Sequence, residues 1–381
     1  MRKILYYVFA LASCTHQAQP GIESIEPGAY QLGAYLPLLQ GKNVGLCVNH
    51  SSVIGGKHLT DSLISHGVAV EKVFTPEHGF TGTTSDGIAI TYEKDQAPFE
   101  LVSLYGKNKK PNRDQMNGIE IMVFDIQDVG TRFYTYISTM HYVMEACAEN
   151  QIPLVILDRP NPNGSYVDGP VLDTTYRSFV GMHPIPIVHG LTVGELAKMI
   201  NGERWLTNSA QCDLTIIPMK NWDHATPYSL PIRPSPNLPN DLSISLYPSL
   251  CLFEGTIVSV GRGTNYAFQQ IGHPEYPDTS YSFTPTSIEG AKWPPHQNVK
   301  CYGINWINTS PSYELSLAPL IDAYKKMNRE DFFNDYFKKL AGTDELEHQI
   351  RSGMSEEDIR ASWQKDLDEY REKRLNYLIY N

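Results

Sequence analysis

The 381-residue sequence has no block of basic residues and no apolar run long enough to cross a membrane. Lys and Arg number 31 against 42 Asp and Glu, so the formal net charge is −11. Without a basic patch or stripe, we do not expect nucleic acid as a partner. A membrane-spanning helix needs roughly 20 apolar residues, and the N-terminal apolar run Ile4–Ala12 is much shorter.

Several motifs that carry particular chemistries are also missing. There is no P-loop, no Gly-x-Ser-x-Gly elbow, and no Gly-x-Gly-x-x-Gly after the first predicted strand. The 12 histidines show no His-Glu-x-x-His or similar ligand spacing. The sequence therefore predicts neither a catalytic metal nor a nucleotide cofactor.

The six cysteines show no Cys-x-x-Cys spacing. Cys14 belongs to the N-terminal segment described next, and the remaining five are an odd number, so they cannot all pair. Cys47 lies in an apolar strand-like run and Cys147 on an apolar helical stripe, so both are expected in the core. A single disulfide among the other three stays open.

The N-terminus has the pattern of a secretory signal. Two positive residues, Arg2 and Lys3, precede the apolar run, and small residues lead up to Cys14. The sequence Leu-Ala-Ser-Cys ending at Cys14 resembles the lipobox of bacterial lipoproteins. We therefore expect an exported lipoprotein, periplasmic or associated with the outer membrane, that meets the membrane only through a lipid on Cys14. The alternative is an ordinary signal peptide cut nearby.

Short apolar runs separated by helical patterns predict an α/β fold with a parallel sheet. The predicted strands are Val44–Val48, Val68–Phe74, Ile119–Phe124, Leu154–Leu157 and Leu214–Ile217. Helices are predicted at Leu59–His66 and Thr135–Glu149, and a capping box from Thr192 to Glu195 opens another.

The amino-acid composition changes near residue 225, where closely spaced prolines exclude a regular helix and a central strand. We place a domain boundary there. The predicted organisation is a signal peptide (1–13), a lipidated tether (14–35), a Rossmann-like catalytic domain (36–225) and a smaller α+β C-terminal domain (226–381). In the last of these we expect strands at Ile257–Val260 and Cys301–Ile307. A charged helix from Ser355 to about Tyr380 is expected to present a solvated face.

Polar clusters follow three of the predicted strands. Glu77-His78 follows one, Asp125 to Arg132 the next, and Asp158 to Gly164 the third. Ligands of open parallel sheets sit beyond the carboxyl ends of the strands, so the three clusters are expected to converge on one crevice. The long glycine-bearing loop at 79–99 is a candidate lid or wall for it.

The acids in these clusters suit glycoside hydrolysis, which typically uses two carboxyl groups. Glu77 is predicted as the main acid/base, because burial can raise a carboxyl pKa toward neutrality. Asp125 or Asp128 is predicted as the second carboxylate. Structural alternatives are a cap or salt bridge for Glu77 and an ion pair of Asp125 with Arg132. For Asp158 we favour an internal ion pair with Arg159.

An ordered set of motifs resembles the NamZ-type exo-β-N-acetylmuramidases. The motifs are Gly41-Lys42 with Val44-Gly45-Leu46, Pro76-Glu77-His78-Gly79-Phe80, Asp125–Tyr136, Leu157–Pro162, Ser178–Gly181, His189–Thr192, Pro234–Pro239, Glu254-Gly255-Thr256 and Gly261–Thr264. They span about residues 41 to 275 in the family's order. The family commonly has Met at the position of Leu191, which is a minor departure.

The resemblance implies a Rossmann-like domain joined to a smaller C-terminal domain, with the site in the cleft between them. It also implies hydrolytic removal of N-acetylmuramic acid from the non-reducing ends of peptidoglycan fragments, without a cofactor. Muropeptides are then the expected partners. The residues expected to bind substrate are assigned mainly from the strand-end argument; they are Asn49, His78, Arg132, Tyr134, Arg159, Asn161, His189, Asn237, Glu254 and Arg262. Alternative functions are a non-catalytic sugar-binding lipoprotein and a cell-wall esterase or amidase.

Specificity for muramate predicts a cationic fork, because its lactyl ether carries a carboxylate and Arg presents paired donors that match carboxylate geometry. Arg132 and Arg262 are the two candidates, with Arg132 ranked first for its position at a strand end. The alternative for Arg132 is an ion pair with Asp128 or Asp125 that holds the loop.

Overall fold

The computed structural model describes residues 24–77, 79–80 and 98–380. The predicted signal peptide, Cys14, the first part of the tether, His78 and most of the predicted 79–99 loop lie outside these described residues.

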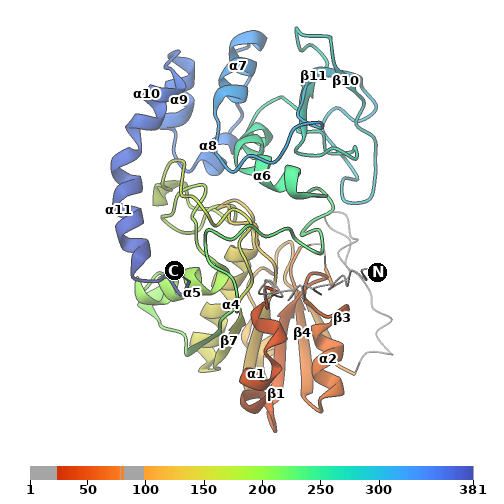
Figure 1. The fold of residues 1–381 in the computed structure, drawn as a ribbon, viewed down its shortest axis with the longest axis vertical. Helices are drawn as coiled ribbons and strands as arrows, with labels where there is room; N and C mark the ends of the chain where they lie inside the picture. Colours follow the sequence, from red (N-terminus) through yellow and green to blue (C-terminus); the bar gives the residue numbers. More distant parts are fainter. Residues whose placement is uncertain (1–23, 78, 81–97, 381) are drawn as a thin grey trace, which may run out of the picture.

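A six-stranded parallel sheet forms the lower part of the molecule in Figure 1. Its strands are β1 (Asn43–Val48), β4 (Ala69–Thr75), β5 (Glu100–Ser103), β6 (Ile121–Asp125), β7 (Leu154–Leu157) and β8 (Leu214–Ile217). Their order is β5-β4-β1-β6-β7-β8. The chain thus winds outward from β1 to one edge and then from β6 to the other, which is the Rossmann order with its switch point between β1 and β6. The predicted Rossmann-like α/β fold is confirmed.

Helices cover both faces of this sheet because its strands are apolar on both sides. Leu46, Val123 and Val155 belong to the core shared with α1 (Leu32–Leu39) and α2 (Leu59–Ser65). The alternate residues Cys47, Phe124 and Ile156 belong to the core shared with α4 (Tyr136–Asn150) and α5 (Val193–Gly202). The smaller elements of this half are η1 (Gly28–Tyr30), β2 (Val53–Ile54), β3 (Lys57–His58), α3 (Arg113–Met116), η2 (Thr174–Tyr176) and η3 (Thr207–Ser209).

The predicted capping box at the start of α5 is confirmed. The Thr192 hydroxyl accepts from the Glu195 backbone N–H at 3.2 Å, and the Glu195 carboxylate accepts from the Thr192 N–H at 2.9 Å. These two bonds satisfy N–H groups that the first turn of a helix leaves without an intrahelical partner.

The C-terminal part lies above the sheet in Figure 1 and is smaller, as predicted. It combines a three-stranded antiparallel sheet, in the order β10-β11-β9, with several helices. Its elements are α6 (Asp241–Leu250), η4 (Cys251–Gly255), β9 (Gln270–His273), β10 (Ser282–Phe283), β11 (Cys301–Asn305), α7 (Ala318–Met327), α8 (Tyr336–Ala341), α9 (Glu345–Arg351), α10 (Glu356–Ser362) and α11 (Gln364–Leu375). The domain boundary after residue 225 stays a prediction.

Two predicted elements of this part were wrong. Ile257–Val260 is not a strand: within it only Ser259 makes a bridge, to Gly272. The predicted final helix is two helices, α10 and α11, separated at Trp363. Nor is α11 only a solvated face, because Leu367 and Tyr370 on it are buried. Charge alternation along the sequence did not reveal this narrow apolar contact.

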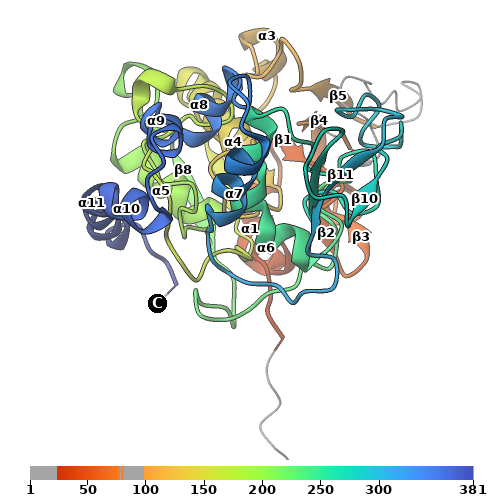
Figure 2. The same cartoon turned by 90° about the horizontal axis from the view of Figure 1, so that it is seen from above.

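The chain end runs back along the N-terminal domain, with α11 descending beside α5 (Figures 1 and 2). Tyr370 donates to the His189 carbonyl at 2.7 Å, and Arg374 to the Gly190 carbonyl at 3.0 Å. The Tyr380 hydroxyl donates to Asp158 at 2.8 Å. These contacts fasten the last helix to the loops that follow the sheet.

The five described cysteines are all unpaired and buried, so the disulfide left open by the sequence does not form among them; they are Cys47, Cys147, Cys212, Cys251 and Cys301. Among the helices of the described chain, none has the length and apolar character needed to cross a membrane.

Candidate active site

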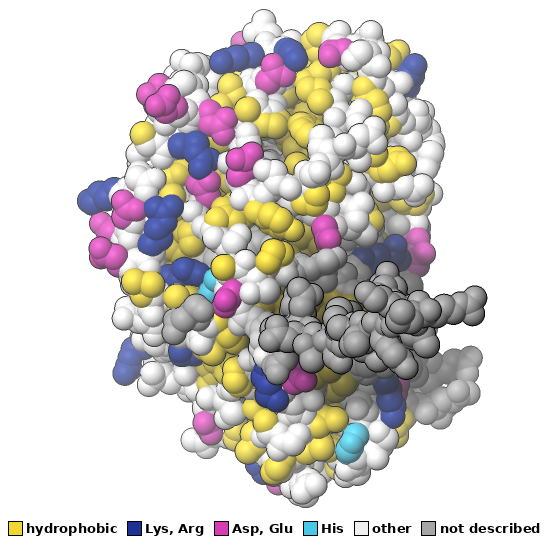
Figure 3. All heavy atoms as spheres, in the orientation of Figure 1, with side chains coloured by type: hydrophobic (Ala, Val, Ile, Leu, Met, Phe, Trp, Pro, Cys, Tyr) yellow, Lys and Arg dark blue, Asp and Glu magenta, His cyan; other side chains and the backbone are white. Residues whose placement is uncertain are grey.

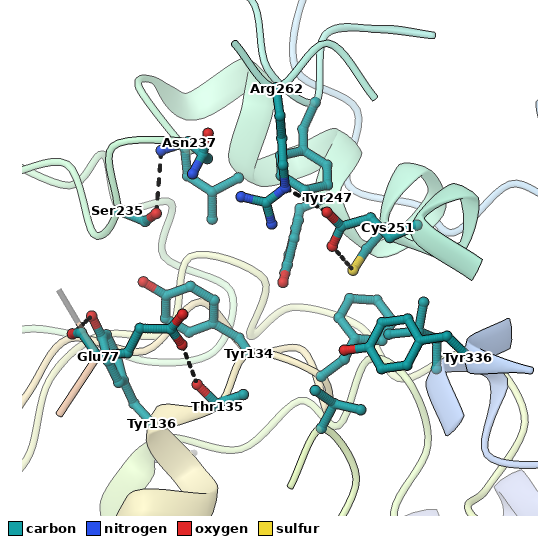
Figure 4. A pocket seen from close by; sticks show the side chains of 16 residues that line it. Glu77, Tyr134, Thr135, Tyr136, Ser235, Asn237, Tyr247, Cys251, Arg262 and Tyr336 are labelled. Atoms are coloured by element: carbon teal, nitrogen blue, oxygen red, sulfur yellow. Dashed lines mark hydrogen bonds and ion pairs between the residues drawn. The ribbon is translucent and has the colours of Figure 1, made fainter. Parts of the chain in front are cut away.

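A cavity of about 150 Å³ lies between the carboxyl edge of the sheet and the C-terminal part. Figure 4 shows the side chains that surround it, which come from segments far apart in the sequence. They are Glu77, Phe133, Tyr134, Thr135, Tyr136, Val180, Ser235, Asn237, Leu238, Tyr247, Cys251, Glu254, Arg262, Phe268, Tyr336 and Leu340. In the space-filling view of Figure 3, Lys and Arg side chains are interspersed with Asp and Glu side chains over the upper left of the face, with hydrophobic side chains between them.

Glu77 reaches the cavity because β4 ends two residues before it, at Thr75. Its carboxylate accepts a long hydrogen bond from the Thr135 hydroxyl, at 3.5 Å. Its backbone carbonyl accepts from the Tyr136 hydroxyl at 3.3 Å. Gly79, with φ of +64°, turns the chain directly afterwards. The turn and the two hydroxyls hold a half-buried carboxyl group at the wall of the cavity.

Tyr134 and Tyr136 form an aromatic corner next to Glu77. Their rings meet edge to face with centroids 4.9 Å apart. The Tyr134 hydroxyl donates to the Pro234 carbonyl at 2.8 Å, which fixes the proline-rich segment from the second half against the first. Burial raises the pKa of both phenols well above the ordinary value, so both stay protonated hydrogen-bond donors at neutral pH.

On the opposite wall, Arg262 pairs with Glu254 through its Nε atom. The other oxygen of Glu254 lies 3.7 Å from the thiol of Cys251. The guanidinium also lies 5.1 Å from the ring centre of Phe268. Burial acts to lower the pKa of Arg262, but the adjacent Glu254 carboxylate outweighs it and raises that pKa. This wall therefore holds a cationic guanidinium, paired with a carboxylate, in a defined orientation.

Asp125, one of the predicted catalytic acids, does not line the cavity. Its side chain is fully buried and forms a two-point ion pair with Arg159. The predicted Asp158–Arg159 ion pair was wrong. Asp158 instead accepts from the Thr192 hydroxyl at 2.7 Å and the Tyr380 hydroxyl at 2.8 Å. Both acids thus have structural partners beneath the sheet edge.

Asp128 is also buried outside the cavity. One of its oxygens accepts from the Gly130 N–H at 2.6 Å, and the other has no hydrogen-bond partner in the described part of the chain. Burial raises the pKa of Asp128 to about 7 and lowers that of His189, 3.9 Å away, to about 3. At neutral pH His189 is therefore uncharged, and this contact is not a strong ion pair.

The expectation that Arg132 points into the crevice was wrong. Its side chain is wholly buried and donates to four backbone carbonyls, those of Pro170, Ile185, Leu340 and Ala341. The alternative ion pair with Asp125 or Asp128 is not formed either, since no carboxylate of the described residues pairs with Arg132. The side chain ties the sheet domain to the end of α8.

Of the predicted site residues that are described, Glu77, Tyr134, Asn237, Glu254 and Arg262 line the cavity together. The others have local structural contacts. The side-chain amide oxygen of Asn49 accepts from the Ser51 hydroxyl at 2.6 Å, and the side-chain amide of Asn161 donates to the Leu191 carbonyl at 2.9 Å. These residues lie at the carboxyl edge of the sheet, directly below the cavity. The strand-end rule therefore selected residues of this lower layer together with Glu77, which reaches the cavity.

Sequence reasoning missed other residues that line the cavity, among them Thr135, Tyr136, Ser235, Tyr247 and Tyr336. Tyr136 and Ser235 belong to motifs that were noticed, so proximity to Tyr134 and Asn237 was an available signal. Tyr336, at the start of α8, carries no sequence signal. No cluster of three or more His, Cys, Asp or Glu side chains suited to a metal ion occurs among the described residues.

Comparisons with known proteins identify the family of this chain. The N-terminal model of the exo-beta-N-acetylmuramidase NamZ family matches residues 44–242 and its C-terminal model matches 245–380. The peptidoglycan beta-N-acetylmuramidase NamZ of Bacillus subtilis is 38% identical, over 96% of this chain and 92% of the relative.

Two crystal structures of DUF1343 family proteins from Bacteroides fragilis share the fold. They superpose with TM-scores of 0.88 and 0.80, at 48% and 27% identity. Each alignment covers 94% of this chain and 99% of the other. The protein therefore belongs to the NamZ exo-beta-N-acetylmuramidase family.

Proposed function

We propose that this protein is an exo-acting β-N-acetylmuramidase, a glycoside hydrolase that removes N-acetylmuramic acid from the non-reducing ends of peptidoglycan fragments. The observation that carries the proposal is the 38% identity to the Bacillus subtilis peptidoglycan beta-N-acetylmuramidase along nearly the whole chain. A small cavity with a carboxyl group on one wall suits an enzyme that accepts one terminal sugar.

We assign Glu77 as the general acid that protonates the leaving group. Glycosidases protonate the glycosidic oxygen with a carboxylic acid at the edge of the sugar site. Glu77 is half-buried, lines the cavity, and has a carboxylate contacted by the Thr135 hydroxyl. A residue in this setting can reach a bound sugar without moving the sheet.

Among the described residues that line the cavity, the other carboxyl group belongs to Glu254, and not to Asp125 or Asp128. Glu254 is engaged by Arg262 and the Cys251 thiol, so both of its oxygens are held by protein partners. The remaining ways to complete the reaction are a water held in the cavity and the substrate's own 2-acetamido group acting as nucleophile.

The test is hydrolysis of two matched substrates by the purified protein. A chromogenic N-acetylmuramide and the corresponding N-acetylglucosaminide differ only in the lactyl ether. We expect release of the chromophore from the muramide with clear preference. Cleavage of the glucosaminide alone would contradict the proposal, and loss of acyl groups from intact glycan would indicate an esterase.

We also propose that the chain is exported and lipidated on Cys14, as a periplasmic or outer-membrane lipoprotein. The support is the order of Arg2-Lys3, the apolar run and the Leu-Ala-Ser-Cys sequence. Metabolic labelling with a radioactive fatty acid should mark the wild type and not Cys14→Ser. A labelled Cys14→Ser protein would show that the lipid is elsewhere.

A further inference from the structure

The sugar that we propose as the substrate differs from N-acetylglucosamine by one group, the lactyl ether at O3, whose carboxylate is charged when no peptide is attached. The inference below concerns how the cavity recognises that carboxylate, and it depends on the proposed function. Recognition of a carboxylate inside a partly closed cavity calls for donors that are already oriented and charged.

Arg262 is the only cationic side chain among the described residues that line the cavity. It sits between Gly261 and Gly263, whose φ angles of +78° and +82° are in the left-handed region that favours glycine. A Cβ at Gly263 would lie 2.5 Å from Pro294, so the turn is closely packed. The tight turn directs the Arg262 side chain across the top of the cavity in Figure 4.

The contacts of Arg262 use one side of the guanidinium and leave another free. Nε donates to Glu254, and the ring of Phe268 lies against the group. The two terminal nitrogens, Nη1 and Nη2, have no hydrogen-bond partner in the described part of the chain. The side chain keeps 27% of its surface exposed, so this edge is open to the cavity.

The other two arginines predicted to bind substrate, Arg132 and Arg159, are already engaged by partners within the protein. Both terminal nitrogens of Arg132 donate to backbone carbonyls, four in all. Nε and Nη2 of Arg159 donate to the Asp125 carboxylate. Neither lines the cavity. Within the described part of the chain, an anionic group that enters the cavity therefore meets one available guanidinium, on the wall that Figure 4 shows across from Glu77.

Glu254 contributes orientation without occupying that fork. One of its oxygens receives Nε of Arg262 and the other receives the thiol of Cys251, so both oxygens have partners on the protein side. The pair holds the guanidinium plane in place before substrate arrives, which lowers the ordering cost of binding.

We propose that the Nη1/Nη2 edge of Arg262 binds the lactyl carboxylate of N-acetylmuramic acid and thereby determines the preference for muramate over N-acetylglucosamine. Glu254 is a positioning residue that acts through Arg262. Two parallel charge-assisted hydrogen bonds match the two carboxylate oxygens. By the usual strength of such bonds, their loss corresponds to roughly a 10- to 100-fold change in selectivity.

The experiment compares three chromogenic substrates: the N-acetylmuramide, the same sugar with its lactyl carboxylate converted to a carboxamide, and the N-acetylglucosaminide. The wild type should cleave the muramide roughly 10- to 100-fold more efficiently, by kcat/KM, than the carboxamide. Arg262→Gln should bring that ratio close to one. Arg262→Lys keeps the charge but loses the paired donors, so its muramide-to-carboxamide ratio should lie between those of the wild type and Arg262→Gln.

A matched control is Arg329→Lys, because Arg329 also pairs with acids, Asp331 and Glu275, but is only half-buried and lies outside the cavity. It should leave the substrate ratio unchanged. Melting temperatures of all variants check folding. An unchanged carboxylate-to-carboxamide ratio in folded Arg262→Gln overturns the proposal, since the carboxylate is then read elsewhere.

A binding measurement separates this inference from the proposed hydrolysis. Calorimetric titration with free N-acetylmuramic acid and with free N-acetylglucosamine requires no turnover. Preferential binding of the acid by the wild type, lost in Arg262→Gln, supports the assignment even if no glycoside is cleaved. Equal binding of both sugars by the wild type overturns it even if the protein proves to be a muramidase.

Discussion

The guanidinium of Arg159 forms a two-point ion pair with the carboxylate of Asp125, joining the carboxyl ends of β7 and β6. The Nε–Oδ1 and Nη2–Oδ2 distances are 2.5 and 2.9 Å. The side chains are 6% and 0% exposed, so neither charge has bulk water to compensate for a lost partner. The pair holds together the two strand ends from which the loops beneath the cavity arise.

Asp125→Asn should therefore destabilise the protein by about 3 to 5 kcal/mol, because it leaves the Arg159 charge buried and unpaired. Urea unfolding followed by tryptophan fluorescence measures this loss. The double variant Asp125→Asn/Arg159→Met removes both charges and should be less destabilised than Asp125→Asn alone. Equal midpoints for wild type and Asp125→Asn would show that the pair contributes little.

Arg132→Met should lower stability by at least about 3 kcal/mol, because four buried carbonyl groups lose their donor. Since Arg132 does not line the cavity, the folded fraction should keep the wild-type preference for muramate. Arg113→Met, at an exposed position in α3, is the control for the same change in side chain. If Arg132→Met instead loses the preference for muramate while its stability is unchanged, Arg132 binds the substrate.

Glu77→Gln should lower kcat on the chromogenic muramide by about a hundredfold or more, which is what general acid–base catalysis contributes. The amide keeps the shape of the side chain but has no proton to transfer. Glu71→Gln makes the same change at an exposed position on β4, the strand that leads to Glu77, and should retain full activity. Near-normal turnover by a folded Glu77→Gln protein would remove Glu77 from the acid role.

Asp128 should make stability fall as pH rises from about 4 to 7. Burial raises its pKa from 3.8 to about 7, so in this window the folded protein keeps a proton that the unfolded chain has lost. The contribution is fully present below pH 4 and gone above pH 7, with a slope of up to about 1.4 kcal/mol per pH unit.

The comparison with Asp128→Asn isolates this effect, because an amide does not titrate and its oxygen can still accept from Gly130. The stability of the variant relative to wild type, from urea unfolding at several pH values, should rise across the window. Other titrating groups, including Asp158 with its pKa raised to about 6, are common to both proteins and cancel. A constant difference would mean that Asp128 is ionised throughout.

The strand-end argument explains both what was predicted well and what was not. Alternate side chains of a strand, such as Leu46 and Cys47, belong to two different hydrophobic cores, so the strands appear in the sequence as short apolar runs. In a parallel sheet the ends of these strands share one edge, where ligands bind. That rule placed Glu77 correctly at the cavity. It also selected Asp125 and Asp128, which lie at the same edge but one layer deeper.

The sequence by itself determined the family, the parallel α/β character of the sheet domain and the presence of Glu77 at a strand end, because these depend on local periodicity and on ordered motifs. Only the tertiary structure decided which arginine faces the cavity. Arg132 finds acceptors at Leu340 and Ala341, 208 and 209 residues away, and is withdrawn by them from the cavity. Arg262 is left with a free edge because Glu254, eight residues before it, takes only Nε. A buried guanidinium is stable only where its N–H groups find hydrogen-bond acceptors. For Arg132 those acceptors come together only when distant segments of the chain pack against each other.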